Sequence, residues 1–324
     1  MSRPQAIPSL PRTAAGPLAG PAAAGWLVWT CLWIVYVVWG STYLAIRVMV
    51  ETVPPLLGSG SRFLLAGVLM LAFLTVRKGF AAIRPTRRQM AGCLALGILL
   101  PGANAVVTVA EVSVPSALTA LLIAVTPLVV IVLRLLAREP ISRTSLAAVA
   151  VGFLGVAILL LPGERPDGAS LAGMLAIVFA AAMWGSGSFA SPRMDLPRDP
   201  FVSTAWQMFL GGLVIFSAGV LAGEVGDVRP ERFSTESVAA FAYLVLFGSL
   251  IAFSAYVWLL QNVPVSKVAT YAYVNPVIAI VLGWLILNEQ ITGMTLVGAA
   301  VIVASVAAVV RIESTAGARR ANPR

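Results

Sequence analysis

Residues 146–161 read LAAVAVGFLGVAILLL, a stretch that is apolar on every side of a helix. At a rise of 1.5 Å per residue, about 20 such residues cross the roughly 30 Å of hydrocarbon in a bilayer. A strand of a membrane barrel would instead alternate polar and apolar residues over about ten positions. The stretch therefore predicts a transmembrane helix.

Similar apolar stretches follow one another along the chain, each bounded by charges or prolines. The chain is 59% hydrophobic and only 11% charged, with a mean hydropathy of +0.94, whereas soluble domains are about one quarter charged. A soluble globule is therefore excluded, and we predict an all-α polytopic membrane protein embedded in a lipid bilayer. Its ten predicted spans cover residues 27–50, 56–76, 90–110, 115–136, 145–161, 171–190, 201–222, 238–260, 266–287 and 294–310.

Basic and acidic residues divide between the two sets of loops. Most of the 22 Lys and Arg residues fall in the tails and in the loops on the same side, while the opposite loops carry most of the 13 acids. Because cytoplasmic loops are enriched in Lys and Arg, we predict that both termini are cytoplasmic and that the protein lies in the inner membrane. The net charge of +9 reflects this topology, and no nucleic-acid partner is predicted, since that would require a basic patch on a water-soluble face.

Residue types that support metal or acid–base chemistry are scarce. The chain contains no histidine, which excludes imidazole ligands, and its two cysteines, Cys31 and Cys93, fall inside predicted spans, where free thiols serve as small apolar residues. We predict no cofactor, no metal site and no catalytic residue.

The chain resembles itself at an offset of about 145 to 150 residues. VWGS (38–41) matches MWGS (183–186), SRFLLAG (61–67) matches WQMFLGG (206–212), and Val114-Pro115 with Pro127 matches Val263-Pro264 with Pro276. Each unit holds five spans, an odd number, so the second unit must lie upside down relative to the first. Inverted repeats are common in secondary transporters, whose substrate site lies near the midplane between the units.

The repeat divides the chain into four parts. We predict a disordered cytoplasmic tail at 1–25, a first repeat at 26–163, a second repeat at 170–312 and a basic cytoplasmic tail at 313–324, with a short linker at 164–169.

These stretches resemble the EamA-type branch of the drug/metabolite transporter superfamily over nearly the whole chain outside the tails. The resemblance implies ten transmembrane helices in two inverted five-helix repeats, and transport of amino acids, sugars, nucleotide-linked metabolites or drugs. Most bacterial members of this type are exporters. The resemblance rests on the motifs WGSTYLAIR (39–47), SRFLLAG (61–67), PSALTALLIAVTPLVVIVLRLLARE (115–139), MWGSGSFASPR (183–193), WQMFLGG (206–212) and VSKVATYAYVNPVIAIVLGWLILNE (265–289).

Polar and aromatic residues inside the spans are candidates for a substrate site, because polar groups in a bilayer usually face protein or a water-filled path. Several lie at i, i+4 spacing on one helix face. The candidates for substrate binding are Trp39, Tyr43, Arg62, Asn104, Trp184, Ser188, Gln207, Trp258, Lys267, Tyr271 and Asn275. Glu111, on the same face as Asn104 and Thr108, is the candidate carboxylate for proton coupling.

Each candidate also has a structural interpretation. The aromatic residues could form interfacial belts, Arg62 and Lys267 could extend toward the membrane surface, and Asn104 could hydrogen-bond a neighbouring helix. Pro127 and Pro276 each remove a backbone donor and could either open the backbone toward a cavity or only kink the helix. Glu139 and Glu289 are expected at helix ends.

We predict a secondary transporter that exports small metabolites such as amino acids and works by alternating access around a central pocket. An exporter of drugs or aromatic cations is the alternative. A passive channel is disfavoured by the internal repeat and the lack of a filter-like loop, and a membrane-embedded enzyme by the lack of a nucleophile, metal cluster or acidic pair. No P-loop of the form GxxxxGK[ST] is present. The sequence does not indicate an oligomeric state.

Overall fold

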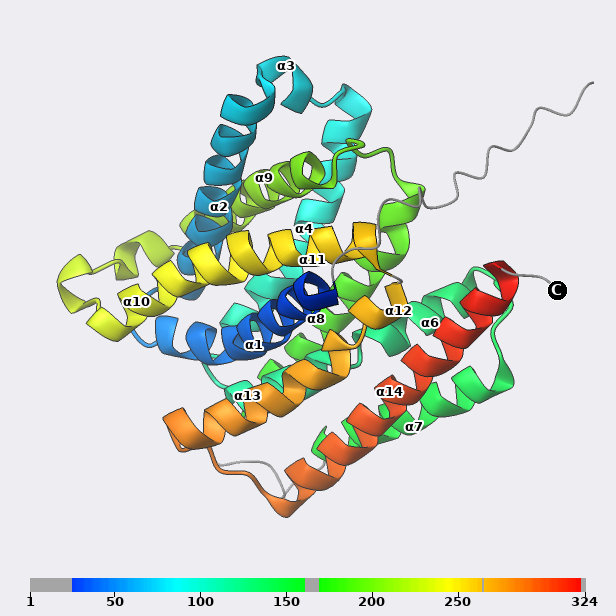
Figure 1. Ribbon diagram of the computed structural model, residues 1–324. Helices are drawn as coiled ribbons and strands as arrows, with labels where there is room; N and C mark the ends of the chain where they lie inside the picture. The colour runs from blue at the N-terminus through cyan, green and yellow to red at the C-terminus, as the bar shows by residue number, and fades with distance from the viewer. Residues whose placement is uncertain (1–24, 161–168, 264, 322–324) are drawn as a thin grey trace, which may run out of the picture.

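The computed structural model describes residues 25–160, 169–263 and 265–321, and within these ranges all regular structure is helical (Figure 1). Nine of the described helical segments are long and apolar enough to cross a membrane, and α13 (Tyr271–Leu287) is a shorter apolar helix. The predicted ten-helix membrane fold is confirmed. Residues 1–24 of the predicted tail and 164–168 of the predicted linker lie outside the described residues.

The crossing segments match the predicted spans closely. In chain order they are α1 (Gly25–Met49), α2 (Pro55–Lys78), α4 (Arg87–Ala110), α5 with α6 (Ser116–Ile123 and Thr126–Leu136), α7 (Arg143–Leu160), α8 (Leu171–Ala190), α9 (Pro200–Leu221), α10 with η4 and α11 (Thr235–Tyr243, Leu244–Ile251 and Ala252–Asn262), α12 with α13 (Val265–Val268 and Tyr271–Leu287) and α14 (Gly293–Ala321). The short helices α3 (Phe80–Ile83), η1 (Ser191–Arg193), η2 (Glu224–Asp227) and η3 (Pro230–Arg232) lie in the connections.

Several helices begin at residues that satisfy their free amide groups. Thr86 and Gln89 form a capping box at the start of α4, and the Ser170 side chain caps α8. Asp199 caps α9 just before Pro200, a position where a missing N–H has no consequence. These polar residues set the helix starts where the apolar stretches begin.

Three crossing segments are not regular α-helices. The fourth is broken between α5 and α6, just before Pro127, and the Thr126 hydroxyl donates to the Ile123 carbonyl at 2.7 Å. The ninth is broken between α12 and α13, whereas Pro276 lies inside α13. Of the two outcomes left open for the prolines, a break in the helix accompanies Pro127, whereas the helix continues through Pro276. The eighth segment contains a π-helix, η4, which the sequence pattern did not predict.

The last helix is longer than predicted. α14 continues to Ala321 instead of ending near residue 310, so it includes most of the stretch expected to be a tail. Residues 311–321 include three Ala and three Arg, which favour helix.

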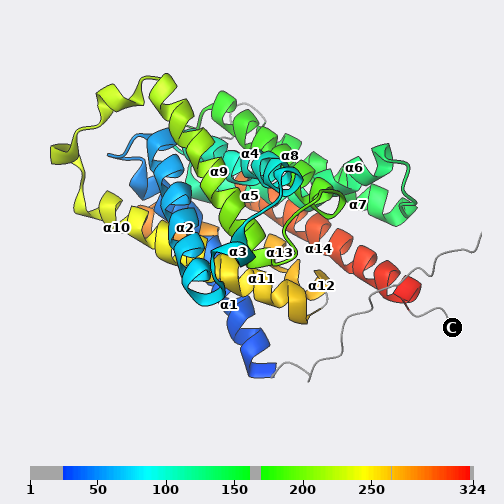
Figure 2. The same ribbon diagram turned by 90° about the horizontal axis from the view of Figure 1, so that it is seen from above.

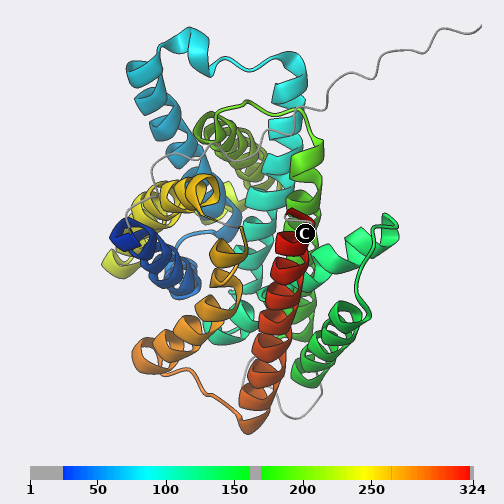
Figure 3. The same ribbon diagram turned by 45° about the vertical axis from the view of Figure 1, so that its right-hand side comes forward.

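Helices of the first half lie against helices of the second half. α2 contacts α9, α7 contacts α14, and α1 contacts α13. Figures 1 and 3 show α14 running along α7, and Figure 2 shows α2 beside α9. Glycines allow this close approach: a Cβ at Gly67 would lie 2.5 Å from the backbone nitrogen of Phe209, and one at Gly212 would collide with that of Leu64.

The two ends of the bundle carry different charges. The end that holds the α2–α4 connection and the start of α9 carries Lys78, Arg84 and Arg87, and is called the basic end. The opposite end, where α1, α4, α9 and α13 finish, carries Glu51, Glu111, Glu224 and Glu289, and is called the acidic end.

An ion-pair network joins the two halves at the basic end. Glu139 lies between Arg134 of α6 and Arg193 of η1, and Arg134 also contacts Glu313 of α14 at 2.5 Å. The hydrogen bond from Arg134 and the charges of Arg134 and Arg193 hold the pKa of the Glu139 carboxyl below its usual value, against some desolvation. The network therefore favours the charged form of Glu139.

Glu139→Gln should lower the thermal unfolding midpoint at neutral pH, and this difference should vanish in acid. A carboxyl whose pKa is lower in the folded protein stabilises it above the unfolded pKa, near 4.3 for Glu, and loses this effect as pH falls through the folded value. The check is the midpoint of both proteins in detergent at about pH 7 and about pH 3. Glu231→Gln, in an exposed connection at the other end, is the control, and a difference that persisted in acid would contradict the assignment.

Candidate functional site

A cavity of about 110 Å³ lies in the middle of the bundle, where the two halves meet. A single water needs about 10–15 Å³ of such space, so the cavity has room for a small solute. Both halves contribute to its wall: α1, α2, α4 and the α5–α6 break from the first, and α8, α9, η4, α11 and α13 from the second. The lining residues are Trp39, Thr42, Tyr43, Arg62, Phe63, Ala103, Asn104, Val107, Ala120, Ile123, Ala124, Thr126, Pro127, Trp184, Met208, Gly248, Ser249, Phe253, Tyr271, Ala272, Asn275 and Pro276.

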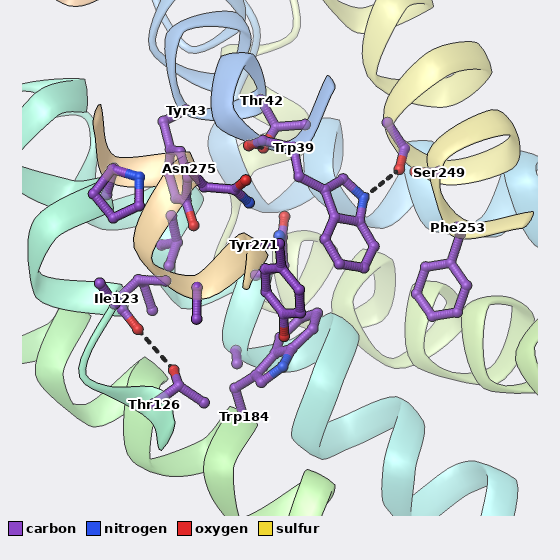
Figure 4. A pocket seen from close by; sticks show the side chains of 18 of the residues that line it. Trp39, Thr42, Tyr43, Ile123, Thr126, Trp184, Ser249, Phe253, Tyr271 and Asn275 are labelled. Carbon is purple, nitrogen blue, oxygen red and sulfur yellow. Dashed lines mark hydrogen bonds between the residues drawn. The ribbon is translucent and has the colours of Figure 1, made fainter. Parts of the chain in front are cut away.

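Aromatic rings form one side of the cavity. The ring centroid of Trp39 lies 5.3 Å from that of Tyr271 and 5.9 Å from that of Phe253, both edge to face. In Figure 4, Trp39 from α1, Tyr271 from α13 and Trp184 from α8 surround one space. Rings at these separations stabilise each other and offer flat apolar faces to a solute.

The π-helix η4 places a backbone carbonyl against Trp39. A π-helix shifts the hydrogen-bond pattern by one residue, and such segments are frequent at functional sites. The carbonyl of Gly248 accepts a hydrogen bond from the Trp39 indole N–H at 3.2 Å. The irregular backbone of η4 therefore fixes the orientation of the central aromatic ring.

Arg62 brings a buried positive charge to the cavity wall. Its side chain is 4% exposed, its Nε donates to Ser249 Oγ at 3.0 Å, and its Nη1 donates to Asn104 Oδ1 at 3.1 Å. Among the residues that the structure describes, Arg62 forms no ion pair. A buried charge without a direct ion-pair partner costs several kcal/mol, and an anionic group in the cavity would offset part of this cost.

Asn275 connects the two halves beside the cavity. With its amide nitrogen facing the carbonyls of Tyr36 and Tyr271, it donates to both at 3.2 Å. The first bond crosses from α13 to α1, so Asn275 holds these helices together as well as lining the cavity.

Seven of the eleven predicted substrate-binding residues lie on the cavity wall: Trp39, Tyr43, Arg62, Asn104, Trp184, Tyr271 and Asn275. Ser188 does not, because its exposed hydroxyl bonds back to the Trp184 carbonyl at 2.9 Å. Gln207 is buried on α9 but does not line the cavity, and its amide donates to Ser203 Oγ of the same helix at 2.9 Å.

The other two predicted residues lie toward the basic end. Trp258 packs in the cluster formed by the start of α1 and the end of α11. Lys267 is exposed, with its ammonium 4.8 Å from the centre of the Trp29 ring. We leave all four residues outside the candidate site.

The sequence pattern missed several wall residues, notably Thr42, Phe63, Ser249 and Phe253. Ser249 and Phe253 are spaced i, i+4, one residue out of phase with the helix face that carries the predicted residue Trp258. The π-helix changes the phase of the segment, and apolar spacing along an irregular helix does not reveal which face turns inward. Phe63 and Thr42 adjoin predicted residues, but nothing in their local pattern distinguishes them from lipid-facing positions.

The described part of the chain contains no group of three or more Cys, Asp or Glu side chains able to hold a metal ion. We assign no cofactor-binding residues.

A ten-helix membrane bundle whose two halves enclose an aromatic cavity with a buried cation has the architecture of a membrane transporter. The chain belongs to the EamA-like transporter family, whose sequence pattern matches residues 27–161 and, a second time, residues 171–311. The resemblance of the sequence to EamA-type transporters is thus confirmed.

Individual relatives agree with this assignment. The chain is 37% identical over 253 residues to the "Uncharacterized inner membrane transporter YedA" of Escherichia coli (strain K12), covering 78% of this chain and 80% of that protein. It is 24% identical over 279 residues to a "Probable amino-acid metabolite efflux pump" of Salmonella typhimurium, covering 84% and 90%. A crystal structure of a protein with 20% identity shares the fold, with a TM-score of 0.61 over 91% of this chain and 100% of the other.

Proposed function

We propose that the protein is a secondary transporter that exports small organic solutes carrying a carboxylate, such as amino acids or related metabolites, by alternating access around the central cavity. The observation that carries this proposal is the buried Arg62 guanidinium, which lines an aromatic cavity and has no ion-pair partner among the described residues. Both halves of the bundle line the cavity, as rocking of one repeat against the other requires.

The wall suits a solute with one charged end and one apolar part. A guanidinium recognises a carboxylate through two parallel hydrogen bonds, and Ser249 and Asn104 hold Arg62 in place for it. Trp39 and Tyr271 then cover the apolar part. A sugar would need more hydrogen-bonding groups than this largely apolar wall provides.

Two further observations support the direction and location of transport. One relative is named "Probable amino-acid metabolite efflux pump" and another "Uncharacterized inner membrane transporter YedA". The basic end carries the charge excess expected of cytoplasmic loops. These observations support our proposal that the protein lies in the inner membrane with both termini cytoplasmic and the acidic end outside, and that it transports its solute outward.

Export of aromatic cations is the competing function, because Trp39 and Tyr271 could also attract a cation through their ring faces. Arg62 opposes it, since a second positive charge in the same buried space is repelled. The two functions are separated by counterflow in proteoliposomes, with amino acids, sugars and quaternary aromatic cations as separate solutes. Saturable counterflow of amino acids but not of cations is expected; exclusive exchange of cations would overturn the proposal, and flux without saturation would indicate a channel.

Trp39→Ala should raise the half-saturating concentration of an apolar amino acid about 30-fold. Loss of a buried aromatic face removes about 2 kcal/mol of apolar contact, which corresponds to this factor in affinity. The measurement is counterflow at a series of concentrations, normalised to folded protein. Trp258→Ala, which changes a tryptophan off the cavity wall, should alter the concentration dependence by less than about twofold; equal effects of both variants would remove Trp39 from the site.

A further inference from the structure

Glu111 is a buried acidic residue that does not line the central cavity. It follows the last residue of α4, its side chain is 0% exposed, and neither carboxyl oxygen has a hydrogen-bond partner among the residues that the structure describes. Buried carboxylates are almost always paired or hydrogen-bonded, because the charged form is otherwise strongly disfavoured. An unpartnered buried carboxyl is therefore a place where a proton binds.

Glu111 lies on the same face of α4 as Asn104, the residue that accepts a hydrogen bond from Arg62. Asn104, which accepts from Arg62, is followed on α4 by Thr108, whose hydroxyl donates to the Asn104 carbonyl at 2.9 Å, and then by Glu111. Seven residues at 1.5 Å each separate Asn104 from Glu111 by about 10 Å along the helix axis. The Arg62 and Glu111 side chains are close enough to interact electrostatically.

A second space adjoins Glu111 at the acidic end. This vestibule, of about 260 Å³, is lined by Arg47, Glu51, Val112, Ser113, Val114, Pro115, Leu287 and Glu289. Arg47 donates to the backbone carbonyls of Glu111 and of Val112, the latter at 2.9 Å, and so covers Glu111 from the vestibule. Glu111 thus lies between the vestibule and the wall of the central cavity.

The groups that act on Glu111 come from three elements. They are Arg47 and Tyr43 of α1, Arg62 of α2, and Glu289, which follows α13. Glu289 itself is held in place, because its two carboxyl oxygens accept from the Ser116 and Ala117 amides at the start of α5, at 2.7 and 3.0 Å. The neighbouring helices α5, α8 and α9 contain no charged residue.

We propose that Glu111 is a proton-binding site coupled to the carboxylate site at Arg62, so that an anionic solute and one proton occupy the transporter together; this rests on the proposed function. When Glu111 is ionised, it shares the positive charge of Arg62 and competes with the carboxylate of the solute. When Glu111 takes a proton from water, its negative charge is lost and Arg62 is free to bind the solute. The solute and the proton then cross in the same direction, and the outward gradient of the solute drives the step.

The expected size of the coupling follows from charge separation. At an effective dielectric constant of about 20, two unit charges about 10 Å apart change each other's binding by roughly tenfold. The chain has no histidine, the side chain that ordinarily titrates near neutral pH. A pH dependence of solute binding that disappears in Glu111→Gln would therefore assign the proton site to Glu111.

Benzoate is a suitable probe, since it carries a carboxylate on one aromatic ring and stays ionised between about pH 6 and about pH 9, and benzamide is its uncharged counterpart. In the purified full-length protein, benzoate should bind roughly tenfold more tightly near pH 6 than near pH 9. Glu111→Gln should bind it tightly and equally at both, and Glu51→Gln, which alters an exposed acid in the vestibule, should behave as the wild type. Benzamide binding should not depend on pH.

A second measurement needs no variant. Benzoate added to weakly buffered wild-type protein near pH 8 should be accompanied by uptake of protons, up to about one for each benzoate bound. Benzoate binding that is independent of pH, or that takes up no proton, would refute the proton site and leave the proposed function intact. Failure of benzoate to bind the wild type at any pH would instead refute the carboxylate site of the proposed function, and with it the coupling.

Discussion

Arg62→Gln will reduce counterflow of a carboxylate-bearing solute about 100-fold. Removing one partner of a buried, hydrogen-bonded charge pair costs about 2–5 kcal/mol, and a 100-fold change in affinity corresponds to about 2.8 kcal/mol. Glutamine keeps much of the length of the side chain and still has an amide able to reach Asn104 or Ser249, the two residues that hold Arg62. The measurement is the initial rate of counterflow with the solute below its half-saturating concentration.

The choice of glutamine has a precedent inside the chain, because the second repeat carries Gln207 at the matching position. That residue is buried and lies away from the cavity. The matched control is Lys267→Gln, which removes the same charge from an exposed residue beside Trp29 and should leave the rate within about twofold, since exposed charges contribute little. Equal losses of counterflow in both variants would mean that the rate depends on the total positive charge of the protein and that Arg62 does not bind the carboxylate directly.

The number and limits of the membrane spans could be predicted because they depend on local properties. A segment such as 146–161 must be apolar on every side to lie in lipid, and this shows in the sequence one helix at a time. The irregularities of the helices could not be predicted in the same way. Pro127 coincides with a break, whereas Pro276 lies inside α13 and the ninth span breaks earlier, because surrounding helices decide whether the freed backbone groups are satisfied.

The candidate site could be predicted in part, for a related reason. Trp39, Tyr43 and Asn104 share helix faces with other polar residues, and these faces turn toward the cavity. Lys267 and Tyr271 appear as one face on a continuous helix, but the break between α12 and α13 separates them, so that only Tyr271 reaches the cavity. Ser249 and Phe253 reach the cavity wall because of the π-helix η4, and a π-helix produces no periodic pattern in the sequence. The residues that share a helix face can be read from a local stretch of sequence. Which faces meet around a cavity depends on how all the helices pack.

Gly212→Ala will destabilise the folded protein by about 3 kcal/mol, although alanine is the better helix former. A Cβ at this position of α9 would collide with the backbone nitrogen of Leu64 on α2, and a backbone cannot move aside as a flexible side chain can. The two helices would have to separate, which would also loosen the neighbouring contact of Gly67 with Phe209. The thermal unfolding midpoint in detergent, compared with that of Gly293→Ala, gives the test. Gly293 begins α14 with nothing within 4 Å of a built Cβ, so its replacement should leave the midpoint unchanged or slightly higher. If Gly212→Ala were as stable as the wild type, close backbone contact between α2 and α9 would not be what holds the two repeats together.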